Sequence, residues 1–378
     1  MSWHGNLVVD GVAHAYTFGD DNRRPECPPA AYNGLVDWIH GFLHAPLEST
    51  EPGYLLSRAE YGCSWNAEDL ASVFWEESDV DVIAYHGVEI DAFFERGSSP
   101  WSVGVELKKA FPDRVLLYCP VDPLKGEAEL ERMQARHEEC PVDGWKCYPT
   151  NGIIDPATSN VHMALFDDRE LAFPFWEKAL ELGVPRVAVH KAMPVGPGRL
   201  DKDNVHDVSV AAVAFPQIQF EVVHAGWAFL EDSALQMMLH GNVWANLENV
   251  ANFAVRQPRK FAHVIGTLLQ YAGPDRIMFG TGCCAAHPQP ILEAFAAFEM
   301  PEDLMEGWGF PAVTDEVKAK ILGGNIARLH GFDPAERLAR LAGDEWATRR
   351  AERRAREAEA GRRSPWRAHR ERNGFAVA

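Results

Sequence analysis

Side chains that can bind metal ions recur in this chain at the ends of short apolar runs. Imidazole and carboxylate groups together can hold Zn, Mn or Fe, and two histidines with one carboxylate suit nonheme Fe(II). A lone histidine is more often a core residue satisfied by hydrogen bonds, but several at equivalent positions predict one shared metal site. The candidate metal ligands are His14, His86, Glu89, His190, His224 and Glu248.

Lys146 and His224 are the candidate catalytic residues. Lys146 lies inside the run Trp145-Lys146-Cys147-Tyr148-Pro149. A protonated lysine is a poor metal ligand, so it would need carbamylation to bridge two ions. Its other role is that of a cation that holds a substrate carboxylate. The sequence leaves both roles open.

Eight apolar, β-branched runs alternate with helix-like stretches, which predicts a (β/α)8 TIM-type barrel. In such barrels the functional side chains stand at the carboxyl ends of the strands. A doubly wound open sheet is the alternative, but it would usually carry a glycine-rich phosphate loop after the first strand, and this chain has none there. The runs are Leu7–Asp10, Val80–Tyr85, Arg114–Cys119, Gly144–Tyr148, Arg186–His190, Gln219–His224, Val243–Leu247 and Arg276–Gly280.

Helix signals lie between these runs. Asn66, followed by an acidic first turn, predicts a helix start. Residues 171–182 predict a helix that ends at Gly183. Residues 316–322 predict another that ends at Gly323-Gly324.

Two regions fall outside the strand–helix alternation. Residues 19–65 form a long insertion after the first strand, expected to be a lid, a pocket wall or an oligomer arm. Residues 332–378 are rich in Ala, Arg and Glu and predict a helical extension of the barrel domain, residues 1–331. The insertion's aromatic side chains suit a bulky apolar substrate. The candidate pocket residues are Trp38, Tyr54, Trp65, Tyr148, Lys191 and Trp227.

Charge is unevenly distributed in the 378 residues. The net charge is −19, yet residues 337–378 hold 12 Arg and 6 acidic side chains. An acidic body argues against a nucleic-acid partner, because phosphate binding needs a basic surface. The arginine-rich segment could bind RNA or a membrane, but we expect it to fold back on the acidic body.

The sequence contains no long apolar run and no signal peptide at its start, which predicts a cytoplasmic protein without a membrane partner. The seven cysteines form no CxxC pair and are expected to be reduced.

The chain resembles the amidohydrolase superfamily, in its branch with aminocarboxymuconate-semialdehyde decarboxylase. The motifs occur in that family's order over residues 6–331. This resemblance implies a metal-dependent barrel enzyme. The matching segments are Val9-Asp10-Gly11-Val12-Ala13-His14, Lys146-Cys147-Tyr148-Pro149, Val189-His190-Lys191, Phe220-Glu221-Val222-Val223-His224-Ala225-Gly226, Arg276-Ile277-Met278-Phe279-Gly280-Thr281-Gly282 and Ile321-Leu322-Gly323-Gly324-Asn325-Ile326-Ala327-Arg328-Leu329.

Two positions depart from the family pattern. The family's first strand usually ends in His-x-His, and here Val12 replaces the first histidine. Its eighth strand usually ends in Gly-Ser-Asp, where the Asp binds metal and acts as general base, and here that position is Gly282. A hydrolase needs a group that takes the proton from the attacking water. His287 is a possible substitute for that base.

Three functions are compatible with these residues. The favoured one is a nonheme diiron, O2-dependent monooxygenase that hydroxylates a diterpenoid-type acid. It follows from a similarity to the unusual superfamily hydroxylase of platensimycin and platencin biosynthesis, an antibiotic pathway. Its cofactors would be two Fe ions, and its partners a small-molecule substrate, O2 and an electron donor.

The alternative is a one-metal zinc decarboxylase or hydrolase of a small carboxylate, since decarboxylation needs no attacking water. The third is a barrel without activity, against which the retained histidines count. For any of these a homo-oligomer is expected.

Overall fold

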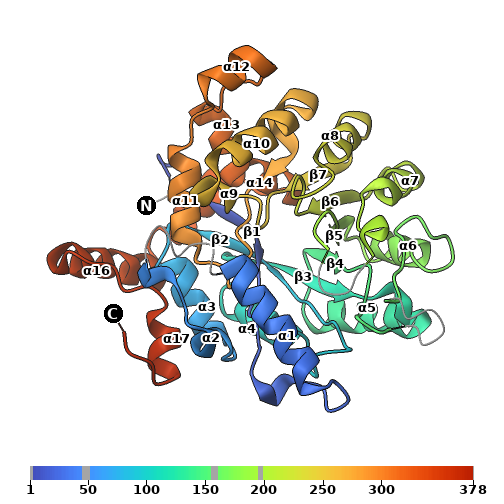
Figure 1. The fold of residues 1–378 in the computed structure, drawn as a ribbon, viewed down its shortest axis with the longest axis horizontal. Coiled ribbons are helices and arrows are strands. Elements are labelled where there is room, and N and C mark those ends of the chain that lie inside the picture. Colours follow the sequence, from blue (N-terminus) through green and yellow to red (C-terminus); the bar gives the residue numbers. More distant parts are fainter. Residues whose placement is uncertain (1–2, 45–51, 155–160, 195–198, 378) are drawn as a thin grey trace.

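The computed structural model describes residues 3–44, 52–154, 161–194 and 199–377. Its centre is a parallel sheet of eight strands, each paired with the next along the chain (Figure 1). The strands coincide with the eight apolar runs, so the predicted barrel is confirmed. They are β1 (Val9–Ala13), β2 (Val82–His86), β3 (Val115–Val121), β4 (Gly144–Cys147), β5 (Arg186–His190), β6 (Gln219–Val223), β7 (Val243–Asn246) and β8 (Ile277–Met278).

The barrel closes between β1 and the segment that follows β8. Ala13 forms a parallel bridge with Cys283. The buried carboxylate of Asp10 accepts a hydrogen bond of 3.0 Å from the backbone N–H of Thr281. Because β8 has only two residues, these contacts hold its end against β1.

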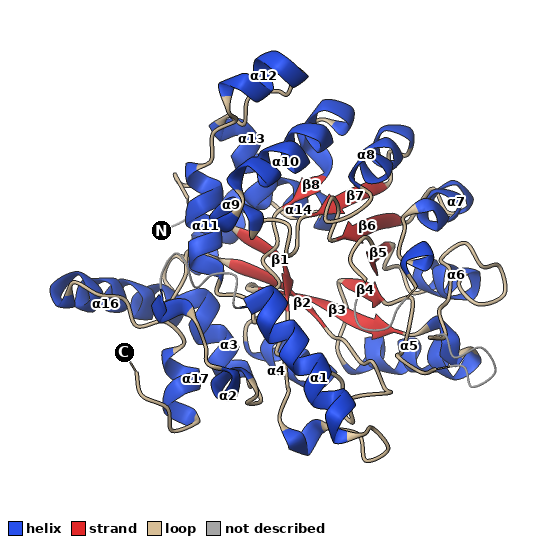
Figure 2. Cartoon of the chain, viewed as in Figure 1, coloured by secondary structure: helices blue, strands red, loops and turns tan. Residues whose placement is uncertain are grey.

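Helices surround the sheet, as the alternation of apolar runs and helix-like stretches in the sequence predicts (Figure 2). Those that follow strands β2 to β7 are α4 (Trp101–Ala110), α5 (Glu127–Glu139), α6 (Phe173–Glu181), α7 (His206–Ala214), α8 (Leu230–Leu239) and α10 (Pro258–Ala272). The others described are α1 (Pro29–Ile39), α2 (Arg58–Tyr61), α3 (Ala67–Ala71), α9 (Phe253–Arg256), α11 (Pro288–Ala297), α12 (Glu302–Trp308), α13 (Asp315–Ala319), α14 (Asn325–His330), α15 (Pro334–Leu341), α16 (Glu345–Ala360) and α17 (Arg367–Arg372).

The helix predicted to end at Gly323-Gly324 instead continues through them. A π-helical turn, Lys320–Gly324, joins α13 to α14 without a break. A Cβ at position 323 would collide with the backbone carbonyl of Leu7. Gly323 therefore allows the helix to pack directly on the start of the first strand, and that contact is the reason for a glycine here.

The insertion and the C-terminal extension pack on each other, although more than 300 residues separate them. Trp366 is fully buried, and its Nε1 donates to the backbone carbonyl of Tyr54 at 2.7 Å. The rings of Trp65 and His369 stack with their centroids 3.8 Å apart. Helix α17 therefore holds the insertion against the barrel (Figure 1).

Ion pairs fold the arginine-rich extension onto the acidic body, as expected. Arg350 and Arg353 are buried and pair with Asp81 and Glu77 at 3.2 Å each. Arg370 pairs with Glu60 at 2.7 Å. No described helix is both long and apolar enough to cross a membrane.

We expect Trp366→Ala to lower the free energy of unfolding by about 3–5 kcal/mol, the usual loss for a buried aromatic side chain. Chemical denaturation followed by circular dichroism measures it. Trp308→Ala is the matched control, because that indole is 61% exposed and its loss should change stability by less than about 0.5 kcal/mol. Equal effects in the two variants would mean that α17 does not hold the insertion.

Candidate metal centre and active-site pocket

Four of the predicted metal ligands meet at the carboxyl ends of the strands. His14 follows β1, His190 ends β5, His224 follows β6 and Glu248 lies two residues beyond β7. Each is at most 2% exposed. The parallel strands bring these ends to one mouth of the barrel, so residues up to 234 positions apart become neighbours.

All three histidines are anchored in the same way. In each ring one nitrogen faces a backbone carbonyl oxygen, which can only accept a hydrogen bond, so that nitrogen carries the proton. The other nitrogen of a neutral ring then keeps its lone pair. The anchoring pairs are His14 Nδ1 with His86 O at 2.9 Å, His190 Nε2 with Met193 O at 2.8 Å, and His224 Nδ1 with Glu248 O at 3.2 Å.

The lone-pair nitrogens of His190 and His224 face each other. Nδ1 of His190 lies 3.0 Å from Nε2 of His224. Burial lowers the pKa of both rings well below the usual value, so both favour the neutral form. Two lone pairs this close repel unless a cation or a proton lies between them. Two ligands at right angles around an ion, with bonds of about 2.1 Å, are about 3.0 Å apart. The spacing therefore fits a shared metal ion.

Burial lowers the pKa of His14 to about 4, so it too is neutral, and Glu248 and His224 are among the groups that act on it electrostatically. Among the described residues, no three His, Cys, Asp or Glu side chains are arranged closely enough to hold a metal ion as they stand. The match to a metal ion therefore rests on the opposed pair, with His14 as the third imidazole. Anchoring of the second ring nitrogen by an oxygen is the usual arrangement in metal-binding histidines.

Glu248 fills the space where a side chain at position 282 would stand. A Cβ added to Gly282 would collide with Oε1 of Glu248 and lie 3.0 Å from Oδ1 of Asn249. Gly282 also has φ +72°, in the left-handed region that disfavours side chains. The carboxylate absent from the end of β8 is thus replaced, in space, by one from the end of β7.

One oxygen of Glu248 is hydrogen-bonded, and the other only contacts a histidine ring and has no hydrogen-bond partner among the described residues. Oε1 accepts a hydrogen bond of 2.8 Å from the Asn249 amide, and Oε2 contacts Nδ1 of His224. Burial raises the pKa of this carboxyl. The contact with His224 orients that ring and favours the tautomer with a proton on Nδ1.

Lys146 is buried behind the Tyr148 ring. Its Nζ lies 5.1 Å from the ring centroid and forms no hydrogen bond or ion pair within the described ranges. Burial lowers its pKa, and its charge helps to lower those of His190 and His224. The ammonium is therefore free to interact with an anion.

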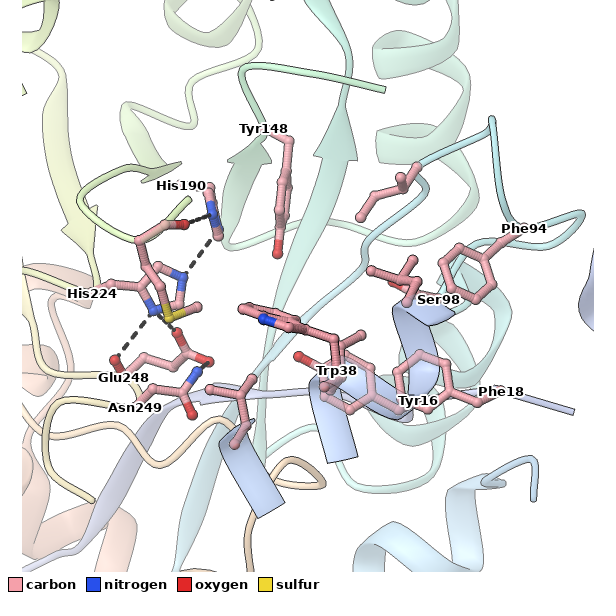
Figure 3. A pocket seen from close by; sticks show the side chains of 15 residues that line it. Tyr16, Phe18, Trp38, Phe94, Ser98, Tyr148, His190, His224, Glu248 and Asn249 are labelled. Atoms are coloured by element: carbon pink, nitrogen blue, oxygen red, sulfur yellow. Dashed lines mark hydrogen bonds and ion pairs between the residues drawn. The ribbon is translucent and has the colours of Figure 1, made fainter. Parts of the chain in front are cut away.

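An apolar pocket of about 490 Å³, a volume that includes open solvent, is lined by His190, His224 and Glu248, whereas His14 and Lys146 do not line it (Figure 3). Helix α1 and the π-helical turn η2 (His40–His44) form one wall of it, so the insertion acts as a pocket wall. Of the predicted pocket residues, Trp38 and Tyr148 line it. Leu43 of the insertion, whose apolar side chains were expected to suit such a substrate, also lines it, and sequence reasoning missed Tyr16, Phe18, Leu35, Ile39, Ile90, Phe94, Ser98, Met193 and Asn249.

Glu89 is not brought to the metal centre. Its carboxylate pairs with Arg132 at 2.7 Å, Arg136 at 2.8 Å and Lys125 at 2.9 Å. Burial would raise the pKa of Glu89, but these cations lower it to about 2. His86 stays next to His14, with its ring stacked on Tyr118 at 4.2 Å and both ring nitrogens without partners among the described residues.

Four further candidates also lie outside this pocket. Tyr54 and Trp65 pack at the junction of the insertion and the extension. Lys191 forms a buried ion pair of 2.8 Å with Asp207, and Trp227 lines a neighbouring cavity. His287, the possible substitute base, is buried beside Glu77 at 3.3 Å.

The close fit of Gly282 against Glu248 can be tested by a double-mutant cycle. We expect Gly282→Ala to lower the free energy of unfolding by about 2–4 kcal/mol, from the clash and the left-handed backbone together. In a Glu248→Ala background only the backbone penalty of about 1–2 kcal/mol should remain. Denaturant titration measures both.

Gly183→Ala is the matched control. Gly183 has φ +69°, and a Cβ there would meet nothing within 4 Å. This variant should show the backbone penalty alone, with or without Glu248. An equal loss for Gly282→Ala and Gly183→Ala would contradict the close fit.

Solved structures with the same fold include several decarboxylases, all at low sequence identity. An uncharacterized TIM-barrel protein of Bordetella bronchiseptica has a TM-score of 0.55 and 17% identity, covering 87% of this chain and 99% of its own. A 2,6-dihydroxybenzoate decarboxylase from Rhizobium has a TM-score of 0.54 and 13% identity, covering 85% and 98%.

A 5-carboxyvanillate decarboxylase of Novosphingobium aromaticivorans, complexed with manganese and 4-hydroxy-3-methoxy-5-nitrobenzoic acid, has a TM-score of 0.53 and 13% identity, covering 87% of this chain and 97% of its own. At these identities the likeness shows the fold alone. A search of curated proteins gave no match.

A family model gives the more specific result. The model described as Amidohydrolase matches residues 80–332, which is more than half of the 378 residues. This span covers strands β2 to β8, with His190, His224 and Glu248. The chain therefore belongs to the amidohydrolase family.

Proposed function

We propose that this protein is a one-metal decarboxylase of a carboxylic acid with an apolar, aromatic-sized body. The observation that carries the proposal is the common anchoring of three buried imidazoles. Each ring of His14, His190 and His224 directs one nitrogen to an oxygen and leaves the other with its lone pair. Three imidazoles with an open position make a standard catalytic metal site.

His14, His190 and His224 would hold a single divalent ion, and Glu248 would act as a positioning residue for His224. Such an ion would bind the substrate carboxylate and offset its negative charge. The manganese bound in a decarboxylase of the same fold supports this choice of metal.

The placement of the pocket carboxylate favours decarboxylation over hydrolysis. Glu248 is the one carboxylate among the described residues that line the pocket, and its Oε2 lies against Nδ1 of His224, without a hydrogen bond. Position 282 offers no side chain. Hydrolysis needs a group that takes a proton from water, whereas loss of CO2 does not.

Lys146 and Tyr148 complete the chemistry of the proposed reaction. Lys146 supplies a cation without a carboxylate partner in the described structure. The bond between the carboxylate carbon and the substrate body breaks, CO2 leaves, and the electron pair stays on the substrate carbon. That carbon takes a proton from Oη of Tyr148, which points into the pocket (Figure 3). Burial raises the pKa of Tyr148, so the proton leaves only to a strongly basic carbon, and water restores it afterwards.

The diiron monooxygenase predicted from the sequence gains no support. A second ion would need further ligands, and the carboxylate of Glu89 is held by three cations. The similar structures include decarboxylases and a protein described as a putative metal-dependent hydrolase. O2 and an electron donor as partners, two Fe ions, the cytoplasmic location and the homo-oligomer have no observation here that favours them.

Metal content provides a test that does not depend on activity. We expect about one Mn²⁺ per chain by elemental analysis after loading and desalting. His190→Ala and His224→Ala should weaken Mn²⁺ binding by more than the roughly 10–100-fold typical of a lost outer partner. His206→Ala is the control, since that side chain is 67% exposed on the surface. Unchanged metal content in both site variants would refute the assignment.

Anaerobic turnover tests the reaction itself. We expect the manganese-loaded protein to release CO2 from aromatic acids without O2, starting from 2,6-dihydroxybenzoate and 5-carboxyvanillate. Tyr148→Phe should lower kcat by about 10²–10⁴-fold, as loss of a proton donor does. Tyr16→Phe, at the other pocket tyrosine, should lower it by less than tenfold. A product that contains oxygen from O2 would restore the monooxygenase interpretation.

A further inference from the structure

A second cavity adjoins the active-site pocket. It encloses about 850 Å³, part of it open to solvent. The turn η2, Trp227, helix α9 and the start of α10 form its walls. Leu43 and Asn249 line both cavities, so the two share a boundary. Trp38, which lines the first pocket, and Phe42, which lines the second, stack with ring centroids 5.1 Å apart, so this part of the insertion lies between the two cavities.

Two cations without acidic partners line this outer cavity. Arg256 and Lys260 form no ion pair with any described carboxylate, and no Asp or Glu is among the residues that line the cavity. In contrast, arginines of the C-terminal extension are neutralised by acidic residues of the body, as in Arg350 with Asp81.

The surroundings of Lys260 are aromatic rather than acidic. Its Nζ lies 3.8 Å from the ring centroid of Phe253 and 5.5 Å from that of Trp227. Lys260 is exposed overall, and partial burial of its side chain lowers its pKa. An anion in this cavity would interact more strongly than in bulk water, because fewer water molecules screen it.

The outer cavity is linked to the metal centre by hydrogen bonds. The amide of Asn252, a lining residue, donates to Oδ1 of Asn249 at 3.4 Å. The amide of Asn249 donates in turn to Oε1 of Glu248 at 2.8 Å. Asn249 has φ +57°, a backbone conformation that side chains rarely adopt and that often marks functional positions. A molecule that occupies both cavities would pass this residue.

We propose that the outer cavity binds an anionic group at the far end of the substrate, through Arg256 and Lys260. The substrate is then an elongated acid with two anionic ends, one reacting at the imidazoles and one held outside. This inference rests on the proposed function for the identity of the reacting end. A carboxylate and a phosphate-like group share the chemistry that these cations recognise.

Binding of three rigid probes to the manganese-loaded protein tests the proposal by calorimetry. Biphenyl-4-carboxylate has one anionic end, biphenyl-4,4′-dicarboxylate has two, and 4′-phosphonobiphenyl-4-carboxylate carries a phosphonate at the far end. We expect at least one two-ended probe to bind about five- to tenfold more tightly than the one-ended probe, the gain available from two partly exposed charges. A greater gain for the phosphonate would indicate a phosphorylated substrate, and an equal or smaller one a dicarboxylic acid.

Variants in which glutamine replaces the two cations test whether the tighter binding of the two-ended probes arises in this cavity. Arg256→Gln/Lys260→Gln should remove the advantage of the two-ended probes and leave the affinity for biphenyl-4-carboxylate within about twofold. Arg259→Gln is the matched control on the same helix, because Arg259 pairs with Asp303 and does not line the cavity. This variant should keep the full advantage.

Three results would overturn the inference: no advantage for either two-ended probe in the wild type, an advantage that persists in the double variant, or no measurable binding of any probe. Failure of the proposed function is seen separately, as absent manganese or absent CO2 release. Because the double variant leaves His14, His190 and His224 unchanged, its manganese content should match that of the wild type.

Discussion

The hydrogen bonds from three imidazoles to backbone carbonyls are the interaction on which the active site depends. The carbonyls of His86, Met193 and Glu248 each fix one ring nitrogen, and so decide which nitrogen keeps a lone pair. Burial keeps the rings neutral, because a charged imidazolium is costly away from water. The barrel backbone therefore sets the protonation pattern of the metal centre, and the strands act on its chemistry as well as on its position.

Glu248 follows strand β7, yet its carboxylate occupies the space that a side chain after β8 would fill. Its side chain reaches from the end of β7 into the volume left by Gly282. From there its Oε2 contacts Nδ1 of His224. In the proposed decarboxylase this carboxylate orients an imidazole.

The fold could be predicted from the sequence because parallel strands are buried on both faces and therefore appear as continuous apolar runs. The positions of His190 and His224 were predictable for the same reason, as they end such runs, and His14 follows the first run by four residues. Asn249 was not, since its inward direction depends on a left-handed backbone that its residue type does not reveal. Glu89 was misleading because its partners Arg132 and Arg136 lie on α5, 43 and 47 residues later, and no short spacing connects them.

The contact between the insertion and helix α17 also constrains the order of assembly during synthesis. The ring of His44, at the end of the turn that separates the two cavities, lies 6.1 Å from that of Trp366, and His369 stacks on Trp65. Ribosomes release these partners more than 300 residues after the segments that they cover. The eight strands and the imidazoles can come together on the nascent chain well before that point. The pocket wall cannot be held in place until α17 has emerged, so a newly made barrel has its buried imidazoles in position before its pocket is complete.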